Sequence, residues 1–274
     1  MSSKTNTLMS INKKNIQNIK NWFCNYVQTF KHGDKEFQEN IILKEKHTMR
    51  VCKEIVYIGR ELTLTDNELH LAEIMALLHD VGRFEQYARY NTFVDFQSED
   101  HAKLGIKIIK KYGVLNTFDT FTKDLILRTI AYHNRATIPE NETDSCLFFS
   151  KLLRDADKLD IWKVVTDYYH RKKSSRNGAI ELGLPDTPGI SKEVYQDLMH
   201  KKIVDVNNIK NLNDFKLLQT GWIFDINFTP TFQRIKKRHY LEKIQNVLPE
   251  SDKINSIFVL LYQHLDLQLM QETE

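Results

Sequence analysis

The sequence predicts an all-α fold, a helical bundle with additional helices in its C-terminal part. Two observations carry this prediction. Glycine and proline are scarce, with 9 and 5 among 274 residues, which favours long helices over a sheet of many strands. Apolar residues also recur at the 3.6-residue spacing of amphipathic helices along most of the chain. With 41% hydrophobic residues, the chain can bury one sizeable core.

Six helices are predicted in the first two thirds of the chain, each marked by apolar residues at helical spacing. In order, they cover residues 11–30, 35–62, 69–78, 98–111 and 122–134, and a long one from 143 or 144 to 169. The third helix is apolar almost all round, so we expect it to lie at the centre of the bundle.

Capping residues mark the ends of these helices. Thr65 and Glu68 have the spacing of a capping box, in which each side chain bonds to the backbone amide of the other residue. Ser98 and Thr122 are predicted to begin the fourth and fifth helices, and Gly113 is predicted to end the fourth.

The C-terminal part begins with a long loop. Residues 172–190 are rich in Ser, Gly, Pro and charged residues, and 179–182 (AIEL) is predicted as a short strand within them. Further helices are predicted near residues 191–201, 211–222, 230–247 and 252–272. We therefore expect a helical core with its N-terminal helix in 1–172, and a loop with C-terminal helices, packed on the same domain, in 173–274.

The overall composition argues against some binding partners and cellular locations. The chain has 39 basic and 36 acidic residues, and this balance argues against a dedicated nucleic-acid binder. Three widely spaced cysteines form no CxxC pair, which favours a reducing compartment. The N-terminus lacks the apolar core of a signal peptide, and no apolar stretch is long enough to cross a membrane. We expect a cytoplasmic protein with no membrane partner.

The polar doublet His79-Asp80 ends the apolar third helix. Burying an imidazole and a carboxylate without partners would be costly, and an ordinary hydrogen bond or helix cap would satisfy a lone doublet. Other helices, however, carry groups of matching chemistry: His47, His101, His133 and Asp157. A metal site in the core of a bundle requires ligands that converge from facing helices.

The number and type of these side chains suit two metal ions. Asp80 could bridge the ions through its two oxygens, while imidazole-rich surroundings favour Fe, Mn, Co, Ni or Zn over Mg or Ca. Paired ions can activate a water molecule and polarise a phosphoryl oxygen. We expect two divalent transition-metal ions as cofactors.

Three segments resemble the HD-domain superfamily of metal-dependent phosphohydrolases. They are 77–83 (LLHDVGR), 46–51 (KHTMRV) and 154–160 (RDADKLD). The resemblance covers roughly residues 40–170 and implies an HD-domain helical bundle.

The additional histidines, His101 in 100–105 (DHAKLG) and His133 in 131–134 (AYHN), resemble the dinuclear branch, which includes the HD-type diadenosine tetraphosphate hydrolases. The chain lacks the GYP element of the cyclic-dinucleotide phosphodiesterases. It also lacks the acidic pair that follows HD in guanosine tetraphosphate hydrolases.

The resemblance implies the metal ligands, and nearby cationic side chains are candidates for binding the substrate phosphate. It implies these metal ligands: His47, His79, Asp80, His101, His133 and Asp157. Asp157 is chosen over Asp155 because the residue after the alanine is the ligand position in the family, and the choice between the two stays open. The planar guanidinium of Arg83 suits a bidentate phosphate contact, and an ion pair with Glu85 is the equal alternative. Further candidates for substrate binding are Lys103, Arg135 and Lys158.

The predicted function is metal-dependent hydrolysis of a phosphate ester or phosphoanhydride in a small phosphorylated substrate such as a nucleotide. Asp80 and Arg83 are the candidate catalytic residues. Two alternatives use the same ligand set: an HD-type di-iron oxygenase acting on a polyol or phosphonate, and a non-catalytic nucleotide sensor. The exact substrate and the oligomeric state do not follow from the sequence.

Overall fold

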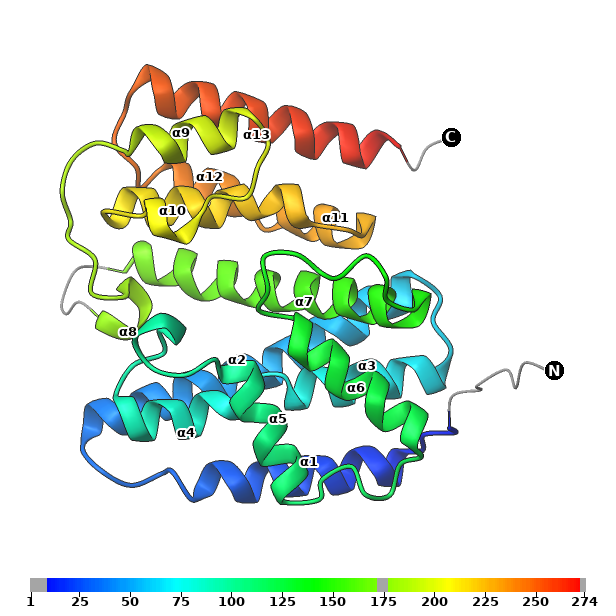
Figure 1. Ribbon diagram of the computed structural model, residues 1–274. Helices are drawn as coiled ribbons and strands as arrows, with labels where there is room; N and C mark the ends of the chain where they lie inside the picture. The colour runs from blue at the N-terminus through cyan, green and yellow to red at the C-terminus, as the bar shows by residue number, and fades with distance from the viewer. Residues whose placement is uncertain (1–8, 172–176, 272–274) are drawn as a thin grey trace. The chain divides into compact units, whose positions relative to one another are not determined.

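The computed structural model describes residues 9–171 and 177–271, and within these ranges every regular element is a helix (Figure 1). The predicted all-α fold is confirmed. The chain divides into two compact units between Ala156 and Asp157, inside one long helix. The domain division predicted between residues 172 and 173 stays a prediction.

The first unit is built around helix α3. Its described elements are α1 (Lys13–Gln28), α2 (Lys35–Glu61), α3 (Asp66–Leu78), α4 (Val81–Tyr90), the 3-10 turn η1 (Asp95–Gln97), α5 (His101–Lys111), α6 (Thr120–Tyr132) and the start of α7 (Asp144–Tyr169). Helix α3 packs against α1, α2 and α6, and α2 runs beside it (Figure 1). Residues 74–78 of α3 are fully buried, as its apolar sequence predicts. This burial brings the C-terminal end of α3 into the interior.

Two of the predicted helix ends are confirmed. Thr65 and Glu68 form the capping box of α3, in which the Thr65 amide donates to the Glu68 carboxylate at 2.9 Å. Gly113 follows the end of α5 with φ +60°, a conformation that glycine adopts without steric cost.

The predicted caps of α5 and α6 are wrong. Asp100, not Ser98, caps α5, and its carboxylate accepts from the first amides of the helix at 3.0 and 3.1 Å. Asp119, not Thr122, caps α6 in the same way. In both cases a nearby carboxylate replaces the hydroxyl, because a negative charge interacts more favourably with a helix N-terminus. The Ser98 hydroxyl donates instead to the Val94 carbonyl.

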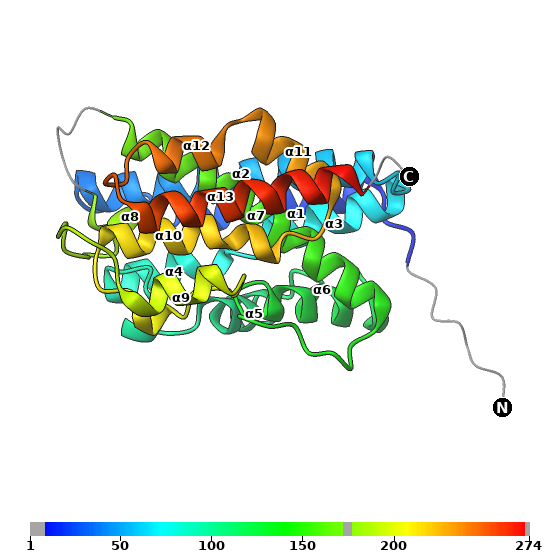
Figure 2. The same ribbon diagram turned by 90° about the horizontal axis from the view of Figure 1, so that it is seen from above.

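The second unit contains the rest of α7 and a set of shorter helices. Its described elements are α8 (Gly178–Glu181), α9 (Lys192–Met199), η2 (Val206–Asn208), α10 (Leu212–Gly221), η3 (Trp222–Asp225), α11 (Thr229–Lys237), α12 (Tyr240–Gln245) and α13 (Asp252–Met270). Helix α13 packs against α9, α11 and α12 (Figure 2). The fully buried Trp162 of α7 donates its indole N–H to the Gln219 carbonyl of α10 at 2.9 Å.

Two predictions for the second unit need correction. The segment predicted as a strand at 179–182 forms α8, because the Asn177 side chain accepts from the amides of Ala179 and Ile180 and begins a helical turn. The single helix predicted over 230–247 is divided into α11 and α12 at His239, whose φ is +54°. Within the described ranges, no helix combines the length and the apolar character that crossing a bilayer requires.

Candidate metal centre

The His79-Asp80 doublet lies at the junction of two helices. His79 is the C-cap residue of α3, and Asp80 directly precedes α4. Helix α4, which the sequence did not predict, packs closely against α5 because Gly82 presents no side chain to the backbone there. A Cβ at Gly82 would overlap the His101 carbonyl oxygen. This close approach brings His101, the first residue of α5, toward Asp80.

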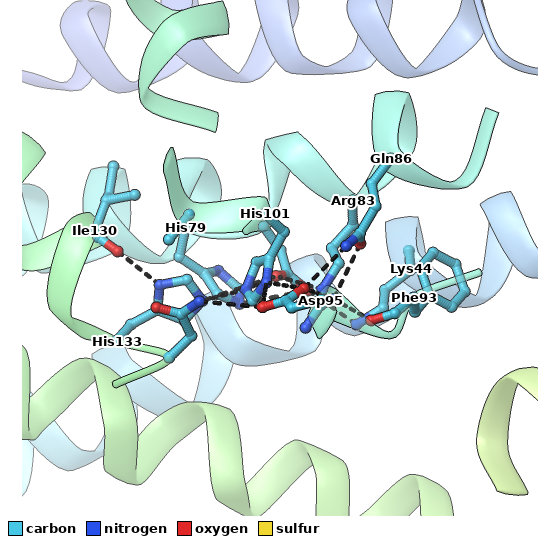
Figure 3. Close-up of polar contacts among 12 residues, drawn as sticks. Lys44, His79, Arg83, Gln86, Phe93, Asp95, His101, Ile130 and His133 are labelled. Carbon is cyan, nitrogen blue, oxygen red and sulfur yellow. Dashed lines mark hydrogen bonds and ion pairs between the residues drawn. The ribbon is translucent and has the colours of Figure 1, made fainter. Parts of the chain in front are cut away.

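Four buried histidines surround the Asp80 carboxylate, and each lies on or at the end of a different helix. Figure 3 shows three of them, His79, His101 and His133, close together. The Nε2 atoms of His47 and His79 lie 3.5 and 3.8 Å from Asp80 Oδ2. The Nε2 atoms of His101 and His133 lie 3.4 and 3.8 Å from the other oxygen, Oδ1. Each carboxylate oxygen therefore faces its own pair of imidazoles.

Hydrogen bonds on the far side of three rings fix which nitrogen carries the proton. The Nδ1 atoms of His79 and His133 donate to the carbonyls of Ala76 and Ile130, each at 2.7 Å. The Nδ1 atom of His101 donates to the Asp95 carboxylate at 2.8 Å. Because these acceptors require a proton on Nδ1, the Nε2 atom of each neutral ring keeps its lone pair for another partner.

The contact between His101 and His133 fits a metal ion. Their Nε2 atoms are 3.0 Å apart, and both Nδ1 atoms already donate elsewhere. Two lone pairs facing at this distance repel unless a cation lies between them. Two metal–nitrogen bonds of about 2.1 Å that meet at a right angle place the nitrogens about 3 Å apart. The donor set therefore suits a transition-metal ion.

Two cations balance the charge of Asp80. Lys44 Nζ lies 3.0 Å from Oδ2, and Arg83 Nε lies 3.5 Å from Oδ1. Burial alone would raise the pKa of the Asp80 carboxyl, but nearby positive charge, chiefly that of Lys44, holds that pKa well below its ordinary value. Burial and the nearby Arg83 lower the pKa of His101 to about 4, so its ring is neutral near pH 7.

Sequence reasoning missed Lys44 and Asp95. Lys44 lies one turn before His47 on α2, and this i−3 spacing is a signal that could have identified it. Its ammonium also lies over the Phe93 ring, 5.2 Å from the centroid. Asp95 lies on the loop between α4 and α5, where no periodic pattern marks a residue that turns inward.

The other predicted substrate-binding residues have partners of their own. Lys103 is 68% exposed and lies 3.5 Å from Asp100, and Lys158 pairs with Asp225 at 2.6 Å. The Arg135 guanidinium lies over the Tyr132 ring at 4.8 Å. Substrate contacts by these three side chains stay predictions.

Arg83 contacts the carboxylates of Asp80 and Asp95, whereas Glu85 pairs with Arg89. The predicted alternative pair between Arg83 and Glu85 is therefore replaced by contacts that hold the guanidinium beside the doublet.

Helix α7 carries the last predicted ligand. The guanidinium of Arg154 binds carbonyls at the C-terminal end of α6, among them that of His133. Asp155 is fully buried, and Asp157, the first residue of the second unit, is half-buried. The choice between these two aspartates as ligand stays a prediction.

Comparison with known proteins finds a similarity in this part of the chain. Residues 45–162 match the family model of the HD domain. This region is therefore similar to HD domains, which are typical of hydrolases that depend on divalent metal ions. The matched stretch spans all six predicted ligands, from His47 to Asp157.

One curated relative shares a short stretch with the chain. Over 78 residues the chain is 37% identical to the CRISPR system single-strand-specific deoxyribonuclease Cas10/Csm1 (subtype III-A) of Methanocaldococcus jannaschii. The stretch covers 27% of this chain but only 9% of the relative, so the chain spans a small part of that protein. No solved structure matches the chain.

Proposed function

We propose that the HD domain is a two-metal phosphohydrolase that acts on a small phosphorylated substrate such as a nucleotide. The observation that carries this proposal is the arrangement around Asp80. One of its oxygens faces His47 and His79, and the other faces His101 and His133. A carboxylate between two pairs of imidazoles is suited to bridge two ions.

In this proposal His47, His79, Asp80 and Asp157 hold the first ion, and Asp80, His101 and His133 hold the second. The continuity of α7 supports the assignment of Asp157. It follows Arg154 by one helical turn, and Arg154 is bound to the end of α6 beside His133. Residues three apart on a helix lie on the same face.

The ions, when bound, supply a water molecule of lowered pKa as nucleophile and neutralise charge on the phosphoryl oxygens. The side chains around Asp80 are already oriented and protonated as metal binding requires. Burial keeps His101 neutral, and the bonds at Nδ1 direct Nε2 of three rings toward Asp80. Lys44 and Arg83 lie on the two sides of the carboxylate and can bind the oxygens of an incoming phosphate. The likeness to part of a deoxyribonuclease supports a phosphate ester as the bond cleaved.

Hydrolysis by the metal-loaded protein tests the proposal. The chelated protein is reloaded separately with Mn²⁺, Fe²⁺, Co²⁺, Ni²⁺ or Zn²⁺. It is then offered nucleoside mono-, di- and triphosphates, dinucleoside polyphosphates, cyclic nucleotides and a single-stranded oligonucleotide. We expect product release with at least one of these substrates, measured by phosphate detection and chromatography.

Matched variants make the result specific. His133→Ala should abolish turnover, whereas His200→Ala, which removes an exposed histidine of α9's C-cap, should not change it. Fewer than one metal ion per chain, together with no hydrolysis of any substrate, would overturn the proposal. Metal-dependent oxygen consumption with a polyol or phosphonate would instead assign the di-iron oxygenase function.

A further inference from the structure

The Asp95 carboxylate joins three elements of the HD domain around the metal centre (Figure 3). It accepts from His101 Nδ1 of α5 at 2.8 Å and from Arg83 Nη1 of α4 at 2.9 Å. It also accepts from the side-chain amides of Gln86, at 2.9 Å, and Asn134, at 3.2 Å. Asp95 is thus the common acceptor for side chains that otherwise belong to separate helices.

Asp95 is not suited to bind a metal ion itself. Together with Asp100 and His101 it forms a group whose candidate ligand atoms lie within 4.8 Å of one another. However, its two oxygens offer about four lone-pair directions, and four donors already point at them. Asp100 is likewise occupied by two backbone amides of α5 and by the Asn134 amide. The Asp95 carboxylate, in particular, has no lone pair left for a metal ion of its own.

The bond from Asp95 distinguishes His101 from the other histidines. The Nδ1 atoms of His79 and His133 donate to neutral carbonyls, whereas that of His101 donates to an ionised carboxylate. A carboxylate acceptor fixes the ring orientation and makes the opposite nitrogen a stronger metal ligand. The effect acts on the Oδ1 side of Asp80, because Oδ1 is the oxygen nearest to His101 Nε2, at 3.4 Å.

We propose that Asp95 is a positioning residue that sets the affinity of the second metal ion, the one between His101 and His133, and leaves the first ion unaffected. This inference rests on the two-ion site of the proposed function. It predicts that the two ions respond differently to a change at one carboxylate that touches neither of them.

Asp95→Asn tests this proposal, with Asp100→Asn as its control. The asparagine keeps the shape of the side chain but replaces one acceptor oxygen with an NH₂ donor that faces other donors. Asp100 precedes His101 directly, yet its carboxylate caps α5, and asparagine caps a helix equally well. Both variants and the wild type are titrated with Co²⁺ alone by calorimetry, and the Co²⁺ absorption spectrum reports ligand geometry.

We expect two bound Co²⁺ ions per chain in the wild type and in Asp100→Asn. In Asp95→Asn the second ion should bind about 10- to 100-fold more weakly, while the first keeps its wild-type affinity. The unchanged first ion then shows that the variant is folded.

Each contrary result has its own meaning. Unchanged affinity for the second ion in Asp95→Asn would overturn the role of Asp95 and leave the proposed function intact. Equal weakening of both ions would show a general structural role and would also overturn the inference. A wild type that binds a single ion would remove the two-ion site, and this inference with it.

Discussion

Gly82→Ala is the change whose effect follows most directly from the structure. Gly82 lies where α4 crosses α5, and a Cβ built there would overlap the His101 carbonyl oxygen and lie 2.7 Å from the Gly105 amide nitrogen. Both obstacles are backbone atoms, which cannot turn aside as a flexible side chain can. The two helices must therefore separate by about 1 Å to admit the methyl group.

This separation has two expected consequences. Forcing a methyl group into a packed helix contact costs about 1–3 kcal/mol of unfolding free energy, and we expect the upper half of that range. Because His101 begins α5, the same displacement moves its Nε2 away from Asp80 and His133, which lie 3.4 and 3.0 Å from it. A misplacement of about 1 Å can reduce turnover roughly a hundredfold.

Urea unfolding followed by circular dichroism measures the loss of stability. Co²⁺ titration measures the displacement of His101 as a loss of metal affinity, and the hydrolysis assay measures turnover. Two other glycines provide graded controls. At Gly59 the added carbon would meet the mobile end of the Leu69 side chain at 2.7 Å, so Gly59→Ala should cost less. At Gly178 nothing lies within 4 Å, and Gly178→Ala should leave both readouts unchanged. A Gly82→Ala variant with the stability of the Gly178 control and two tightly bound ions would refute the reasoning.

Three further predictions concern the Lys44 ammonium, the metal ions and a half-buried histidine. Lys44→Gln should reduce kcat/KM for phosphorylated substrates by about 10- to 100-fold, because a hydrogen bond to a charged group contributes about 1.5–3 kcal/mol. In the control, Lys46→Gln at an exposed position, steady-state kinetics should not change. Removing metal with a chelator should lower the Tm measured in a thermal scan. Each ion, added at about 100 times its Kd, should restore about 2.7 kcal/mol of unfolding free energy. A Tm that does not rise after reloading would contradict a metal site in the folded state. Burial, with a contribution from the Lys201 charge, lowers the pKa of His264 below 6.5, so the unfolded chain binds this proton more readily. The unfolding free energy should therefore fall as the pH drops below about 6.5. In His264→Gln the urea midpoint should fall less steeply with pH than in the wild type. Parallel curves of urea midpoint against pH for the two proteins would contradict this role of His264.

The sequence was sufficient to predict the all-α fold and most of the helices. Apolar periodicity is a local property, so α1, α2, α3, α7 and α13 were found close to their observed bounds. Local sequence signals gave wrong predictions where several neighbouring residues could cap a helix or begin one. Asp100 rather than Ser98 caps α5, and a single asparagine turns 177–181 into a helical turn instead of a strand.

The sequence by itself also predicted which side chains could bind metal, because four histidines and two aspartates lie in or directly after different predicted helices. Metal binding by these side chains stays a prediction. The tertiary structure alone decided how they are used. Which oxygen of Asp80 faces which imidazoles, the charge contributed by Lys44, and the support of His101 by Asp95 all depend on α2, α4, α5 and α6 meeting at one place. That meeting depends on the close approach at Gly82. Contacts between residues far apart in the chain arise from packing, and spacing along a sequence does not encode their distances.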